Sequence, residues 1–123
     1  MKVIFLDRPL LTPIGNDGEW EWGADFRYTV DNRVYLIRAG RTTDLDSVPR
    51  LPLIYWIAKN RARIAAGIHD DLYMRQEGKD YADDAFWAAM LTEGVRQPYR
   101  GMIYGAVKAF GQSSYDKYGV QST

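Results

Sequence analysis

The sequence contains no cysteine and only one histidine, and each scarcity excludes a class of site. Without cysteine, the chain can form neither a disulfide-stabilised scaffold nor a thiolate zinc centre. A metal ion would have to be bound through oxygen or imidazole ligands. With His69 as the single imidazole, a metal centre built on several histidines is excluded as well.

Long apolar runs and a charge of one sign are also missing. No stretch approaches about eighteen apolar residues, so we expect no transmembrane segment. The first apolar run, in MKVIFLDRPLL, ends at Asp7, which is too short for a signal peptide. Sixteen basic and sixteen acidic residues cancel, which gives no strong nucleic-acid signal. The basic cluster of Lys59, Arg61 and Arg63 is expected to solvate a helix start.

The 123 residues that are present predict a single domain, 1–123, of class α+β. Two aromatic and β-branched segments, WEWGADFRYTV and RVYLIRAG, flank the turn pair Asp31-Asn32 and predict a hairpin. Apolar segments separated by glycine and proline predict helices near 50–59, 61–76, 81–95 and 99–111. We expect an N-terminal antiparallel β-hairpin or small sheet, packed against a C-terminal bundle of three to four helices. The tail 112–123 is expected to be a loosely docked end.

The candidate catalytic residues lie on two of these helices. His69 and Tyr73 are one helical turn apart and continue a stripe of alanines, which predicts a tight helix seam. Asp83, near the start of the next helix, is expected to approach His69, fix its tautomer and make it a general base. An alternative places Asp80 as a helix N-cap with Asp83 in the third helical position of a capping box.

Other carboxylates complete the set of candidates. Asp70 follows His69 directly, whereas helical spacing predicts that Asp71 and Asp84 face solvent. In the loop GRTTDLDSVPR, Asp44 and Asp46 could present oxygens to a hard cation. Turn and cap chemistry by Thr43, Asp44 and Ser47 explains the same residues equally simply.

Four motifs, in order, resemble a phage and prophage family of unknown function, DUF1353. They are AGRTTDLDSVPR, AAGIHDDLY, YADDAFWAAMLTEGV and MIYGAVKAFG, and the resemblance extends from about Trp20 to Gly111. It implies a phage or prophage origin, from which we expect a location in the host cytoplasm or virion. The aromatic content, 14%, suggests a phage structural protein or host protein as partner, because aromatic residues dominate protein interfaces. It implies no activity.

A narrower resemblance covers residues 62–90. RIAAGIHDDLY and ADDAFWAAM are similar to the paired helices of the phospholipase A₂ superfamily. The resemblance implies His69 as general base and Asp70 as calcium ligand. It implies Tyr73 as the tyrosine of the hydrogen-bond network and Asp83 as the carboxylate that orients His69. It also implies a lipid ester substrate and a divalent metal, calcium first. The glycine-rich calcium loop of that superfamily has no counterpart before His69.

Two hypotheses follow. In the first, the protein is a metal-assisted hydrolase of a lipid or cell-envelope substrate, with His69, Asp83 and Tyr73 in the catalytic group and Asp70 and Asp44 as metal ligands. In the second, it is a non-enzymatic virion or tail component, or a host-factor-binding protein, and the same polar group locks the helices together. Cavity geometry separates the two, because a general base has to reach its substrate.

Overall fold

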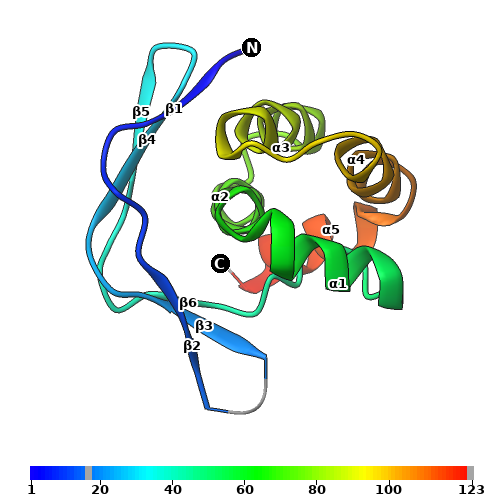
Figure 1. Ribbon diagram of the computed structural model, residues 1–123, viewed down its shortest axis with the longest axis horizontal. Coiled ribbons are helices and arrows are strands. Elements are labelled where there is room, and N and C mark those ends of the chain that lie inside the picture. The colour runs from blue at the N-terminus through cyan, green and yellow to red at the C-terminus, as the bar shows by residue number, and fades with distance from the viewer. Residues whose placement is uncertain (16–17, 122–123) are drawn as a thin grey trace.

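A computed structural model describes residues 1–15 and 18–121, which form six strands followed by five helices. The strands lie along one side of the molecule and the helices along the other (Figure 1). The α+β class is therefore confirmed. The bounds of the strands are β1 Val3–Phe5, β2 Leu11–Ile14, β3 Glu19–Trp22, β4 Phe26–Val30, β5 Arg33–Ile37 and β6 Thr42–Thr43. Those of the helices are α1 Pro52–Arg61, α2 Arg63–Arg75, α3 Lys79–Glu93, α4 Tyr99–Phe110 and α5 Gln112–Gln121.

The strands form two small antiparallel sheets, ordered β1-β4-β5 and β2-β3-β6. The predicted hairpin is β4–β5, in which Val30 pairs with Arg33 across a two-residue turn. Asp31 adopts the left-handed conformation there, with φ at 55°. Aspartate tolerates this region better than most residues, which is why Asp31-Asn32 can close the strands so tightly.

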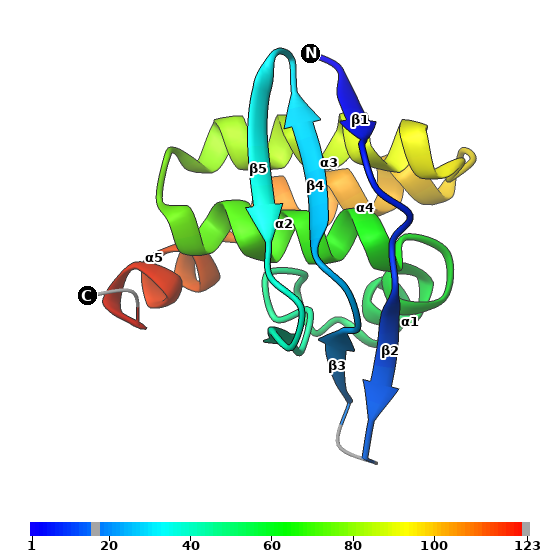
Figure 2. The same cartoon turned by 90° about the vertical axis from the view of Figure 1, so that its left-hand side faces the viewer.

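The sheet β1-β4-β5 lies across α2 and α3 (Figure 2). Alternate residues of β4 point into this contact: Phe26, Tyr28 and Val30 are all buried. Gly67 of α2 is required by the close approach of Trp22 from the other sheet, because a Cβ at Gly67 would lie 2.8 Å from the Trp22 ring. The helix is thus enclosed by strands on one side and by helices on the other.

Helices α2 and α3 form an antiparallel pair joined by a three-residue turn that uses left-handed Gln76 and Gly78. Their shared seam is built from small residues, all fully buried: Ala62 directly before α2, Ala65 and Ala66 on α2, and Ala82 and Ala89 on α3. Small side chains allow the two backbones to approach closely, as the alanine stripe predicts. His69 and Asp83 face each other inside this seam.

Helix α5 corrects the expectation for the tail. Residues 112–121 are helical, and residues 122 and 123 lie outside the described part. Tyr115 fixes the helix to the turn between α2 and α3, since its hydroxyl accepts a hydrogen bond from the backbone N–H of Gly78 at 2.9 Å. Its main-chain carbonyl accepts another from Gln76 at 2.8 Å. Because these anchors are hydrogen bonds, residues 112–121 need no apolar periodicity, which is the pattern that predicts a helix.

Candidate functional site

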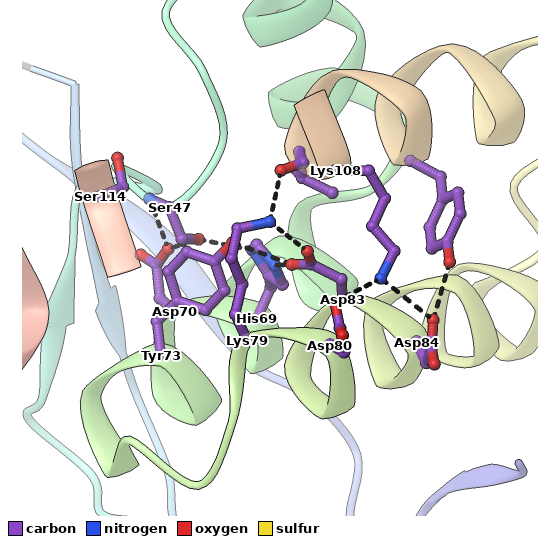
Figure 3. Close-up of polar contacts among 12 residues, drawn as sticks. Ser47, His69, Asp70, Tyr73, Lys79, Asp80, Asp83, Asp84, Lys108 and Ser114 are labelled. Carbon is purple, nitrogen blue, oxygen red and sulfur yellow. Dashed lines mark hydrogen bonds and ion pairs between the residues drawn. The ribbon is translucent and has the colours of Figure 1, made fainter. Parts of the chain in front are cut away.

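The predicted His69–Asp83 contact is present and lies at the centre of a polar network (Figure 3). The His69 Nε2 atom is 2.7 Å from Asp83 Oδ1, and both side chains are fully buried. The Tyr73 hydroxyl donates to the same Asp83 oxygen at 2.9 Å. Lys79 donates to the other oxygen at 2.7 Å. We call Ser47, His69, Asp70, Tyr73, Lys79 and Asp83 the polar network.

Asp83 is the charged centre of this network. Burial raises the pKa of its carboxyl, but hydrogen bonds from His69, Lys79 and Tyr73 outweigh burial and hold that pKa below its ordinary value. The carboxylate is therefore ionised at neutral pH and accepts three hydrogen bonds, with the Lys79 ammonium as its counter-ion. Asp80, by contrast, is not an N-cap: the helix begins at Lys79 after Gly78, and Asp80 is exposed.

The ionised Asp83 assigns the tautomer of His69. Burial lowers the pKa of the imidazole, against the opposing influence of Asp83, so the ring is neutral at pH 7. Because the Asp83 carboxylate can only accept, the single ring proton is on Nε2. Nδ1 is left with a lone pair. This is the tautomer that a general base requires, since Nδ1 can take a proton.

Ser47, and not an open cleft, lies against that lone pair. Its Oγ is 2.9 Å from His69 Nδ1, and Ser47 is fully buried. The loop reaches this position through Leu45, a buried residue in the left-handed conformation with φ at 60°. The sequence predicts only turn or cap chemistry for Ser47, because nothing in the spacing of residues 47 and 69 indicates a contact.

Asp70 extends the network to the other side of Ser47. One carboxylate oxygen accepts from the backbone N–H of Ser47 at 3.1 Å and contacts the Ser47 hydroxyl, while the other accepts from the Thr43 hydroxyl. Burial outweighs these hydrogen bonds and raises the pKa of Asp70 to about 6. Within residues 1–15 and 18–121, no cation forms an ion pair with this carboxylate.

A cavity of about 470 Å³ lies next to Asp70, between the sheet β2-β3-β6, α2 and α5. Thr43 and Asp70 line it, whereas the described part of its wall does not include Ser47, His69, Tyr73 or Asp83. The base is thus separated from the cavity by Ser47 and Asp70.

The cavity wall carries more acidic than basic groups. Four carboxylates line it, namely Glu19, Asp44, Asp46 and Asp70, together with the basic Arg41 and Lys117. Both basic side chains are already paired with carboxylates: Arg41 with buried Asp71 at 2.5 Å, and Lys117 with Asp46 of the same wall at 3.6 Å. A cationic or neutral ligand group therefore suits this wall better than a phosphate does.

The residues expected to hold a metal do not fit one as they stand. Both oxygens of Asp70 already accept hydrogen bonds from Thr43 and Ser47. Among the described residues, no three acidic or imidazole side chains are grouped closely enough to hold a metal ion. The divalent metal, with calcium as the first candidate, stays a prediction.

Asp71 contradicts the helical-spacing expectation. It is buried, not solvent-facing, because β4 and the loop after β5 cover that face of α2. Tyr28 donates a hydrogen bond to it at 2.5 Å, and Arg41 and Arg75 pair with it at 2.5 and 2.9 Å. The neighbouring expectation for Asp84 is confirmed, since that side chain is half exposed.

These features define a small α+β protein with a buried histidine–aspartate network beside an acidic cavity. The chain belongs to the family described as protein of unknown function (DUF1353), whose model matches residues 20–107. The match extends from β3 through most of α4, so it includes the entire polar network but not α5. No curated protein and no solved structure shows a significant match. Among the described residues, no helix has the length and apolar character needed to cross a membrane.

Proposed function

We propose that the protein is a hydrolase of an ester or amide bond, and that the reaction takes place in the cavity beside Asp70. The observation that carries this proposal is the position of Asp70, which lines the cavity and also contacts the network around His69. A carboxyl with a pKa of about 6 changes protonation near neutral pH, as general acid–base catalysis requires.

In this mechanism, ionised Asp70 accepts a proton from a cavity water as the water attacks the substrate carbonyl. Protonated Asp70 then returns that proton to the leaving oxygen or nitrogen. Asp70 is the catalytic residue, whereas His69, Asp83 and Tyr73 position it from the side that faces away from the cavity. His69 does not take the proton from water directly, because Ser47 lies against its free nitrogen.

The acidic wall supports a particular substrate class. Asp44 and Glu19 line the same cavity as Asp70, and both of its basic residues are paired with other carboxylates. We propose a cell-envelope substrate with an amino group near the scissile bond. A phospholipid headgroup would place phosphate against these carboxylates. Phage or prophage origin and action within the host or virion belong to the same proposal.

A second candidate function is supported by the burial of the network. Ser47, His69 and Asp83 are all fully buried, as expected for polar groups that hold α2, α3 and the preceding loop in one arrangement. In this case the protein is a non-enzymatic virion or tail component, or binds a host protein, and the polar network is structural.

The test compares two cavity carboxylates. Wild type, Asp70→Asn and Glu19→Gln are assayed against p-nitrophenyl esters and amino-acid p-nitroanilides, with folding checked by circular dichroism. Glu19→Gln is the matched control, because Glu19 lines the cavity without belonging to the network. We expect Asp70→Asn to lose about 100-fold or more in kcat/KM on both substrate types. Glu19→Gln should stay within a few-fold of wild type on the p-nitrophenyl esters, which have no amino group for Glu19 to bind. Equal activity in all three folded proteins would refute the catalytic role of Asp70, and no turnover above the uncatalysed background in any of them would favour the non-enzymatic function.

A further inference from the structure

The Ser47 hydroxyl has more hydrogen-bond acceptors beside it than it has protons to donate. Its hydroxyl lies between two hydrogen-bond acceptors, His69 Nδ1 at 2.9 Å and the Asp70 carboxylate. A hydroxyl carries one proton and can donate to one acceptor at a time. All three side chains are buried, and the single proton of the Ser47 hydroxyl cannot serve both acceptors at once.

Asp83, His69, Ser47 and Asp70 form a row of hydrogen-bonding groups that is one proton short. Asp83 accepts a hydrogen bond from the Nε2–H of His69, and the Lys79 ammonium balances the Asp83 charge. Between Nδ1 and Asp70 there is then only the Ser47 proton for two acceptors. Both contacts become hydrogen bonds when the row gains one proton, either on Asp70 or on Nδ1.

We propose that Ser47 is a positioning residue that passes this proton between Asp70 and His69. An O–H bond breaks on Asp70 as a new one forms on Ser47 Oγ, while the original Ser47 proton moves to His69 Nδ1. Asp70 becomes a carboxylate, His69 becomes an imidazolium beside ionised Asp83, and Ser47 is unchanged. The inference rests on the proposed function, because it connects the cavity residue Asp70 to a base that does not line the cavity.

The surroundings of Ser47 support a relay role over a nucleophilic one. A nucleophilic hydroxyl has to reach the substrate, but Ser47 does not line the described wall of the cavity. Its backbone N–H also donates to Asp70 at 3.1 Å, so the carboxylate is held against the hydroxyl from two directions. Thr43 donates to the other oxygen of Asp70 and accepts from the backbone N–H of Leu45, so it provides a comparison residue that contacts Asp70 from the side away from His69.

The experiment uses the single histidine, whose ¹⁵N resonances need no assignment among other imidazoles. The Nδ1 and Nε2 shifts are measured near pH 6 in wild type, Ser47→Ala and Thr43→Ala, each with and without Asp70→Asn. We expect Asp70→Asn to shift Nδ1 in the wild-type and Thr43→Ala backgrounds, and this response to be lost in Ser47→Ala. Ser47→Thr, which restores a hydroxyl, should restore it.

An Nδ1 response of equal size with and without the Ser47 hydroxyl would overturn the proposal, because the coupling would then be electrostatic through space. If Ser47→Ala does not fold, a pH series on the wild type replaces it. The Asp70 carboxyl ¹³C and His69 Nδ1 shifts should follow one common midpoint, and two separate midpoints would overturn the relay. These readouts do not require activity. Coupling without hydrolysis would therefore refute the proposed function alone, and hydrolysis without coupling would refute the relay alone.

Discussion

Replacing Asp83 by asparagine tests whether the polar network holds the two central helices together. The carboxylate accepts from His69 at 2.7 Å, from Tyr73 at 2.9 Å and from Lys79 at 2.7 Å, and it has no exposed surface. Asparagine has the same shape, but its amide nitrogen cannot accept a hydrogen bond. Whichever way the amide is turned, one of the donors faces another donor, and the Lys79 charge loses its counter-ion. Breaking a buried ion pair in this way costs about 3 to 5 kcal/mol.

The adjacent Asp84 supplies the control. It is on the same helix and one residue away, with a hydrogen bond from Tyr104 at 2.7 Å and an ion pair with Lys108 at 3.7 Å, but its side chain is 49% exposed. Asp84→Asn should cost about 1 kcal/mol or less, because exposed ion pairs contribute little.

Urea unfolding followed by tryptophan fluorescence measures both costs, because unfolding exposes Trp22, the fully buried one of the four tryptophans. Adding Lys79→Met to Asp83→Asn should recover part of the loss, since the uncompensated ammonium is removed. Equal free energies of unfolding for Asp83→Asn and Asp84→Asn would refute the argument that the network stabilises the helix pair.

Two further predictions concern Asp70 and two helical glycines. The pKa of Asp70 is about 6 in the folded state, above its ordinary 3.8, so folding favours the protonated form and stability falls as pH rises through that range. From about pH 5 to about pH 7.5, urea unfolding should show wild type losing roughly 1.4 kcal/mol more than Asp70→Asn. An equal pH dependence would contradict the raised pKa. Gly67→Ala should lower the unfolding free energy by about 1 to 3 kcal/mol, because the new Cβ meets Trp22. Gly105→Ala, whose new Cβ would meet nothing within 4 Å outside its own helix turn, should be neutral or raise that free energy by up to about 1 kcal/mol. A higher thermal unfolding midpoint for Gly67→Ala than for Gly105→Ala would disprove the packing argument.

The hairpin and the His69–Asp83 contact could be predicted because local rules determine both. Asp31-Asn32 supplies the left-handed conformation of a two-residue turn, and the turn after α2 is too short for anything except an antiparallel neighbour. Once α2 and α3 are antiparallel, a residue near the end of one lies opposite a residue near the start of the other. Spacing within one helix pair was sufficient for this part of the site.

The contacts made by the N-terminal half with α2 could not be predicted in the same way. Helical spacing places Asp71 away from the seam with α3, but it does not show that β4 covers the outward face of α2. Tyr28 and Arg41 contact Asp71 from 43 and 30 residues away. Ser47 likewise reaches His69 across 22 residues. No periodicity in the sequence encodes such pairs, because the sheet and the loop have to be placed on the helices first.

Three buried carboxylates, Asp70, Asp71 and Asp83, and the partly buried Glu93 differ in how their charge is compensated, and the difference points to Asp70. Asp71 has two arginines and Asp83 has a lysine. Glu93 accepts hydrogen bonds from the backbone N–H groups of Ile64 and Ala65 at the positive N-terminal end of α2. Asp70 is held by hydroxyls and one backbone N–H, with no ion pair among the described residues.

A buried carboxyl without a counter-ion lowers stability once it ionises, and an apolar side chain of similar volume would avoid that cost. Packing of α2 against α3 therefore explains Asp83, and the contact with the sheet explains Asp71, but neither explains Asp70. The same residue borders the cavity and contacts Ser47, which leads to His69. A residue that is unfavourable for folding, and connected to a cavity on one side and a base on the other, is best explained by a role in the chemistry of that cavity.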